Sequence, residues 1–243
     1  GFLIGAVACA VLGSVAPISF QAETIVLAGT MGKDIRERLS MIFFGGVLMT
    51  VMGFTGLLTR ITDFAGPTIV SAMMAGVGFM LVKVSLGMTR ENKLVGWVSM
   101  ASAVVIYLVS KIYSPGNALV YTIVGSVVIS TLGSRLSGQE LGNQAVSEKM
   151  GKLKLHKPMI NVSVVRGALS LACLTIGANI AFGGITGGIA GANANIDHLT
   201  VYSGLADAVS SLFGGGPVEA IISATAAAPD AVLSGVLMMV IMA

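Results

Sequence analysis

APISFQAE at residues 16–23 and GGGPVEAIIS at residues 214–223 are the two stretches from which this chain is best understood. Each contains a proline, carries an acid within apolar sequence, and is too short or too polar to span a bilayer alone. Paired, interrupted segments in corresponding places of a membrane chain indicate the midplane binding site of a secondary transporter. A glutamate at membrane depth is energetically expensive, so Glu23 and Glu219 are functional candidates by default.

The composition predicts a membrane protein. Of the 243 residues, 55% are hydrophobic and 10% are charged, and the mean hydropathy is +0.92. A soluble domain carries about 25% charged residues. The net charge of +3 does not indicate a nucleic-acid partner, because the lysines and arginines lie in loops between apolar spans. We therefore expect a multi-pass integral protein of a bacterial inner (plasma) membrane, with the lipid bilayer as its surroundings.

Apolar runs of the length needed to cross a bilayer, about 20 residues, follow one another along the chain. A short amphipathic connector at residues 60–66 is expected to end at Pro67, and a glycine-rich stretch follows Phe182. The long polar loop at residues 135–157 separates two halves that look like repeats, each with a broken proline segment between helices. Both ends look cut, so we expect a fragment of a longer protein. The expected spans are 39–59, 68–88, 94–112, 117–134 and 158–182.

Two glutamates and an amide are the first candidates for binding. A broken helix leaves backbone N–H and C=O groups free to face a ligand, and Glu23 or Glu219 beside them can accept a hydrogen bond from a ring N–H or exchange a proton. The alternative for both is a helix N-terminal carboxylate stabilised by the macrodipole. Asn179 offers a donor and an acceptor to a heterocycle edge, or else joins two helices. We predict that these three side chains line one polar cavity, completed by Ser19 and Ser223.

Asp207 lies inside the helix that precedes the second break, where it can relay protons or cap a neighbouring broken end. Proton coupling is therefore assigned to Glu23, Glu219 or Asp207. The chain contains no Ser/His/Asp set, no His-Glu-x-x-His motif and no metal-ligand spacing. We accordingly expect neither an enzyme nor a cofactor or metal.

These features resemble the nucleobase–cation and ascorbate transporters, which include the xanthine/uracil and adenine/guanine permeases. The resemblance covers nearly the whole chain and is carried by short stretches. Val15-Ala16-Pro17 resembles the start of the family's third membrane segment, and Gly216-Pro217 the start of its tenth. The other matching stretches are TGLL at 55–58, AGVGF at 75–79, ADA at 206–208 and LFGG at 212–215.

The resemblance implies an all-α polytopic fold of two inverted seven-segment repeats. The third and tenth segments would each be a short strand followed by a half-helix, with the ligand between them. On this register, residues 1–66 are core-domain helices of the first repeat and residues 67–134 are gate-domain helices. Residues 135–157 remain the polar loop, and residues 158–243 are core-domain helices of the truncated second repeat.

The function implied is a proton-coupled nucleobase permease that works by alternating access. Its partners would be a purine or pyrimidine base and a proton or sodium ion, and a homodimer is left open.

The chain departs from the family at Asn179, where the eighth segment commonly has an acid, and at Ser223, where the tenth often has one. Two alternatives stay open: an anion permease of the sulfate type with the same architecture, and a membrane module that does not transport. The positive loops suggest an orientation opposite to the family's, so orientation is left open.

Overall fold

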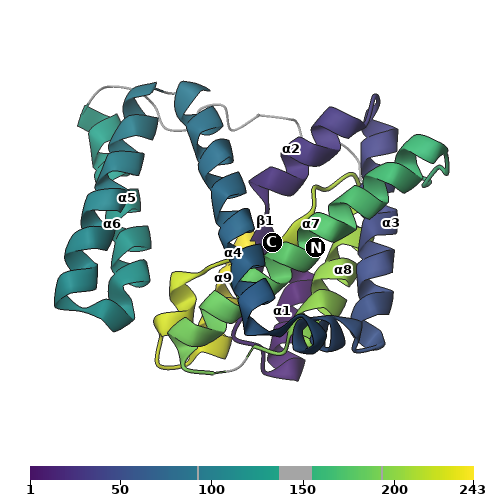
Figure 1. Cartoon of the computed structure of the whole chain (residues 1–243). Helices are drawn as coiled ribbons and strands as arrows, with labels where there is room; N and C mark the ends of the chain where they lie inside the picture. Colours follow the sequence, from purple (N-terminus) through teal and green to yellow (C-terminus); the bar gives the residue numbers. More distant parts are fainter. Residues whose placement is uncertain (92, 137–154, 193) are drawn as a thin grey trace. The chain divides into compact units, whose positions relative to one another are not determined.

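The structure, a computed structural model, describes residues 1–91, 93–136, 155–192 and 194–243 (Figure 1). Most of the polar loop expected at 135–157 lies outside these residues. The described chain is almost entirely helical, as expected for an all-α protein, with one pair of short strands. Five described helical stretches are long and apolar enough to cross a membrane: Ile35–Phe54, Thr68–Gly87, Lys93–Tyr113, Pro115–Arg135 and Val162–Ala190.

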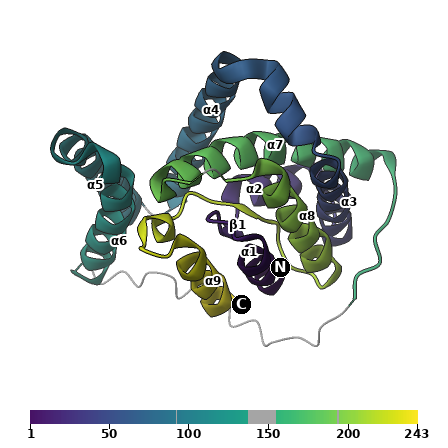
Figure 2. The ribbon, with the colours of Figure 1, turned by 90° about the horizontal axis from the view of Figure 1, so that it is seen from below.

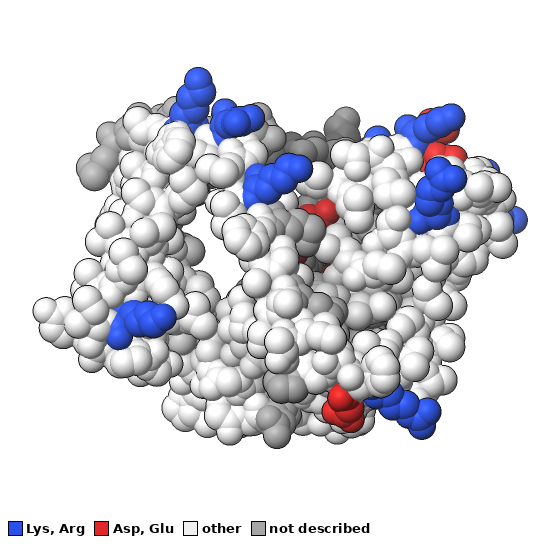
Figure 3. Space-filling view, in the orientation of Figure 1, with Lys and Arg blue, Asp and Glu red and all other residues white. Residues whose placement is uncertain are grey.

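The chain forms two compact units, of which the first comprises Gly1–Gly78 with Leu153–Ala243. In Figure 2, strand β1 of this unit lies in the middle, among α1, α2 and α8. Charged side chains of the unit lie mainly toward the helix ends, and the band between them is largely uncharged (Figure 3). The elements are α1 (Phe2–Leu12), β1 (Ile18–Phe20), α2 (Ala22–Met31), α3 (Ile35–Phe54), α7 (Val162–Ala190), α8 (Ile196–Leu212), β2 (Val218–Ala220), η2 (Ala224–Ala227) and α9 (Ala231–Met242).

The second unit, Phe79–Lys152, contains α5 (Lys93–Tyr113), the 3-10 turn η1 (Pro115–Asn117) and α6 (Ala118–Leu136). Helices α5 and α6 pack against each other along their lengths. Helix α4 (Leu57–Glu91) begins in the first unit and ends in the second. Its backbone is broken at Gly66, where φ is 73° and ψ is 170°, a conformation that is essentially restricted to glycine. The break confirms that the amphipathic connector at 60–66 ends just before Pro67.

Helix α7 is longer than the sequence predicted. The expected end near Phe182 is wrong, because the helix continues through the glycine-rich stretch to Ala190 and ends at Gly191 in the left-handed conformation. Gly187 has no space for a side chain, since an added Cβ would lie 2.6 Å from the carbonyl oxygen of Ala192. Gly187 therefore allows the chain that follows the helix to approach it closely, and Gly191 is the glycine that ends the helix.

The second broken segment also differs from the expectation. The first segment is a strand followed by the ten-residue helix α2. After β2, however, the chain forms only the four-residue 3-10 helix η2 before Pro229. A strand followed by a half-helix thus describes the first segment alone. A proline cannot continue the hydrogen-bonding of a helix that precedes it, so the short run of small residues has no room for a full half-helix.

Helices α3 and α8 cross at a point of very close contact between Gly46 and Gly204. A Cβ added at Gly46 would lie 2.6 Å from the Gly204 carbonyl oxygen and 2.8 Å from the Asp207 Cβ. Small residues at such crossings let membrane helices approach closely. This contact brings Asp207, on α8, against α3.

We predict that Gly46→Ala lowers the melting temperature of the detergent-purified protein, because overpacking of this kind costs about 1–3 kcal/mol. The matched control is Gly184→Ala, whose added methyl group would meet no atom within 4 Å. Alanine favours helix more than glycine does, so the control should melt at or above the parent temperature. Equal melting of the two variants would contradict the close crossing.

Candidate functional site

The two proline segments meet as a pair of antiparallel strands. Strand β1 pairs with β2 so that Ser19 lies opposite Glu219. The Ile221 amide also donates to the Pro17 carbonyl oxygen at 3.3 Å. The prediction that residues 17–24 and 217–224 approach each other with non-helical backbone is therefore confirmed, although 200 positions separate the two prolines.

Side chains from neighbouring elements satisfy the rest of this backbone. Tyr202, fully buried on α8, donates to the Ala16 carbonyl oxygen. The Gln21 amide nitrogen donates to the Ala220 carbonyl oxygen. Further along, Thr186 Oγ1 on α7 donates to the Ile221 carbonyl oxygen at 2.9 Å. Non-helical backbone at membrane depth is tolerated only where protein or a lined cavity satisfies it, and these contacts meet that condition.

Three acids gather at this strand pair. Glu23, Asp207 and Glu219 are 7%, 5% and 0% exposed. Asp207 Oδ1 accepts a hydrogen bond from the Val218 amide at 2.5 Å, and Glu219 Oε1 accepts one from Thr175 Oγ1 at 2.9 Å. Glu219 lies within electrostatic range of both other carboxylates. No lysine or arginine in the described part of the chain acts on the three. They form what we call the acid cluster.

Asn179 lies one helical turn beyond Thr175 on α7 and is fully buried. Its Nδ2 contacts Thr200 Oγ1 at 3.2 Å and Ser203 Oγ at 3.3 Å. Both hydroxyls already donate to carbonyl oxygens of α8, at 2.7 and 3.4 Å, so they can only accept from Asn179. This network sets the orientation of the amide. The amide therefore joins two helices, which was the structural alternative for this residue. Its Oδ1 remains available to accept a hydrogen bond.

Five buried polar atoms have no hydrogen-bond partner in the described structure, and all lie in this region. They are Gln21 Oε1, Glu23 Oε1, Asn179 Oδ1, Thr24 Oγ1 and Glu219 Oε2, of which the last two lie close enough for the Thr24 hydroxyl to stabilise the Glu219 carboxylate. Buried polar groups are normally satisfied, and exceptions require an explanation. Carbonyl-type and carboxylate oxygens accept hydrogen bonds, and the threonine hydroxyl can accept or donate. The site therefore lacks donors, which a ligand rich in N–H groups or a proton would supply.

The two predicted serines have other contacts in this structure. Ser19 is half-buried and its Oγ lies 4.0 Å from Met242 Sδ. Ser223 begins η2 and accepts a hydrogen bond from the Thr225 amide at 3.2 Å. Ser223 therefore acts as a cap here. Glu23, Asp207 and Glu219 lie near one another, whereas the side-chain hydrogen bonds of Asn179 are with α8.

Sequence reasoning missed Gln21, Thr24 and Thr175. The first two lie in the first proline segment itself, so their position beside Glu23 was an available signal. Thr175 precedes Asn179 by four residues, which places both on one face of a helix. The polarity of Thr175 within an apolar span was visible in the sequence, but its hydrogen-bond partner on β2, Glu219, was not.

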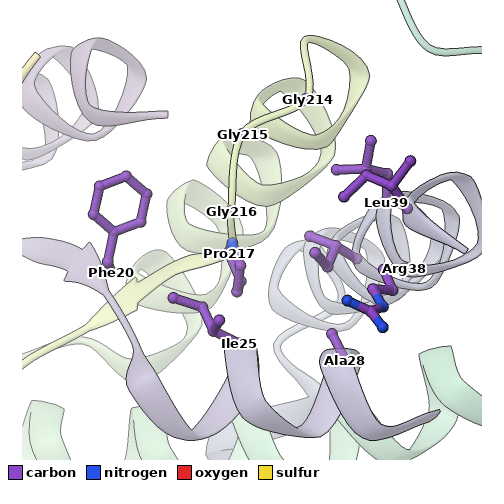
Figure 4. Close-up of a pocket in the computed structure, with 12 residues that line it drawn as sticks. Phe20, Ile25, Ala28, Arg38, Leu39, Gly214, Gly215, Gly216 and Pro217 are labelled. Atoms are coloured by element: carbon purple, nitrogen blue, oxygen red, sulfur yellow. The ribbon is translucent and has the colours of Figure 1, made fainter. Parts of the chain in front are cut away.

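Two cavities adjoin the acid cluster. An open pocket of about 450 Å³ lies between α2, the start of α3 and residues 214–217, with Phe20 at one side and Arg38 at another (Figure 4). Pockets of about 300–1,000 Å³ are typical of small-molecule sites. An inner void of about 10 Å³ is lined by Thr24, Thr175, Asp207 and Glu219, among others. That volume corresponds to about one water molecule, so the inner void is closed to any larger ligand in this conformation.

Comparisons with known proteins give no family assignment. No family model matches this chain, and no curated protein matches it. Function must therefore be argued from the residues of the site.

We predict that Phe20→Cys combined with Val218→Cys forms a disulfide under mild oxidation, in a background of Cys9→Ser and Cys173→Ser. These residues face each other in the strand register, as a non-hydrogen-bonded pair with a typical Cα separation of about 4.5 Å. Disulfides need about 4.4–6.8 Å.

The matched control is Phe20→Cys with Ala220→Cys, a diagonal pair that lies about 7–8 Å apart in a sheet of this kind. Peptide mass spectrometry of the membrane-embedded protein would measure both cross-links. Equal or preferential cross-linking of the diagonal pair would contradict the register.

Proposed function

We propose that this protein is a secondary active transporter, a proton-coupled nucleobase permease that works by alternating access. The observation that supports it is the set of unpartnered oxygens at Gln21, Glu23 and Asn179, buried with the Glu219 carboxylate in the region of one strand pair. A nucleobase carries ring N–H groups, and in some bases an exocyclic amine, and these donors match the unpartnered acceptors of the site. Hydrogen bonds to charged acceptors are roughly twice as strong as neutral ones.

The same observation weighs against the anion alternative. Three carboxylates lie at the strand pair without a lysine or arginine of the described chain to offset them. A sulfate-like ligand brings only negative charge and acceptors, so it would be repelled and would leave the acceptors unsatisfied. The backbone N–H of Val218, a donor of the kind that binds anions, is already bonded to Asp207.

A proton is the coupling ion that this cluster suits best. Glu219 accepts a hydrogen bond from Thr175 and lies beside the Thr24 hydroxyl, and Glu23 has an unpartnered oxygen. Burial disfavours the charged form of a carboxylate, and so do neighbouring carboxylates. A proton taken up with the substrate and released with it on the other side would couple the two fluxes.

The proposed architecture is the inverted-repeat fold of the nucleobase–cation and ascorbate transporters. The paired proline segments support it, since transporters of this kind place their site between two discontinuous segments. The first compact unit would carry the site as the core domain, and the second would belong to the gate domain. Alternating access would then arise from movement of one against the other.

The test is uptake of labelled purines and pyrimidines into cells that lack their own permeases. We expect at least one base to accumulate, with dependence on the pH gradient. Glu219→Gln or Glu23→Gln imitates a permanently protonated acid. Whichever glutamate couples the proton, its Gln variant should still bind and exchange substrate. That variant should no longer accumulate substrate in response to the pH gradient.

The matched control is Asp63→Asn, which changes an exposed acid on α4 and should accumulate substrate like the parent. Proton coupling through these glutamates is refuted if both Gln variants concentrate substrate like the parent, with the same dependence on external pH. Uptake of sulfate without uptake of any base would support the anion alternative. Uptake of neither would support a module that does not transport.

A further inference from the structure

The open pocket and the inner void meet at a wall made of two residues. The pocket is lined mainly by apolar side chains and the backbone of residues 214–216, whereas the lining of the void includes two members of the acid cluster, Asp207 and Glu219, with Thr24 and Thr175. Ile42 and Pro217 are the residues that line both cavities. These two residues therefore separate the open pocket from the void that Glu219 lines.

The two sides of the wall differ in how they are held. Pro217 precedes β2, its ring fixes its own φ angle, and the strand pair and the Asp207 contact to Val218 hold the backbone that follows. Ile42 projects from α3, one turn before Gly45 and Gly46, which add no side chain to the void. The width of the passage consequently depends on one side chain.

Ile42 is well packed on its remaining sides. It is 5% exposed and belongs to a buried cluster with Ala28, Met41, Val164 and Leu171. A β-branched side chain in a helix has essentially one favoured rotamer. Ile42 therefore does not swing aside freely, and the space that it occupies limits what can pass.

We propose that Ile42 is the size-selective barrier between the open pocket and the acid cluster. The inference rests on the proposed function, because it names the residue that limits the size of the ligand at the same site. Passage requires a shift of α3 relative to Pro217, and the side chain at position 42 sets the opening that this shift produces. A smaller residue admits larger bases, and a larger residue blocks all of them.

The test measures access to the acid cluster without relying on transport. A thiol introduced by Glu219→Cys, with Cys9→Ser and Cys173→Ser, is labelled with a small ethylammonium methanethiosulfonate. Adding Ile42→Ala should raise the labelling rate by about tenfold, which corresponds to a decrease of about 1.4 kcal/mol in the activation free energy for labelling. Adding Ile42→Trp should lower the rate by a similar factor. If Glu219→Cys does not fold, Thr175→Cys places the thiol in the same void.

The matched controls are Val47→Ala and Val47→Trp, which change an exposed β-branched residue of the same helix. These should leave the labelling rate unchanged. In uptake, Ile42→Ala should raise the ratio of purine to pyrimidine transport, and Val47→Ala should not. Labelling that does not depend on residue 42 overturns the barrier, whether or not the parent transports a base. Labelling that follows residue 42 while no base is transported supports the barrier and counts against the proposed function.

Discussion

The structure depends on the need to satisfy non-helical backbone inside an apolar, membrane-type core. Helices satisfy their own N–H and C=O groups, but the segments at residues 14–21 and 214–223 cannot. Their backbone groups are satisfied by pairing of the two segments and by hydrogen bonds to the side chains of Tyr202, Gln21, Asp207 and Thr186. Polar groups are therefore concentrated at one place in an otherwise apolar protein.

This requirement also separates the roles of the three acids. Asp207 has a structural role, because it accepts a hydrogen bond from the amide of Val218, the first residue of β2. Glu219 is held by threonine side chains only, accepting a hydrogen bond from Thr175 and lying beside the Thr24 hydroxyl. Glu23 has an unpartnered oxygen in the first turn of α2. The carboxylates that the scaffold engages least are the ones that we propose exchange protons or bind substrate.

The sequence predicted the meeting of the two segments and the acids that accompany it, because prolines and buried charges are rare and costly in membrane spans. It did not predict the register that places Ser19 opposite Glu219, since three-residue strands carry no usable periodicity. Glycine propensity suggested that α7 ends near Phe182, but the helix continues to Ala190, and the chain beyond it approaches Gly187 closely. Thr175 was missed because its partner lies on a distant strand, and Ser223 became a cap because η2 is so short.

We propose that the buried, unpartnered acceptors bind a ligand through its N–H donors. Equilibrium binding to the purified protein tests it most directly, with xanthine and uracil compared with their fully N-methylated analogues and with sulfate. The account predicts that a base with free ring N–H groups binds, that methylation weakens binding by about tenfold or more for each lost hydrogen bond to a charged group, and that sulfate does not compete. Equal binding of methylated and unmethylated bases, or displacement of the base by sulfate, would contradict it.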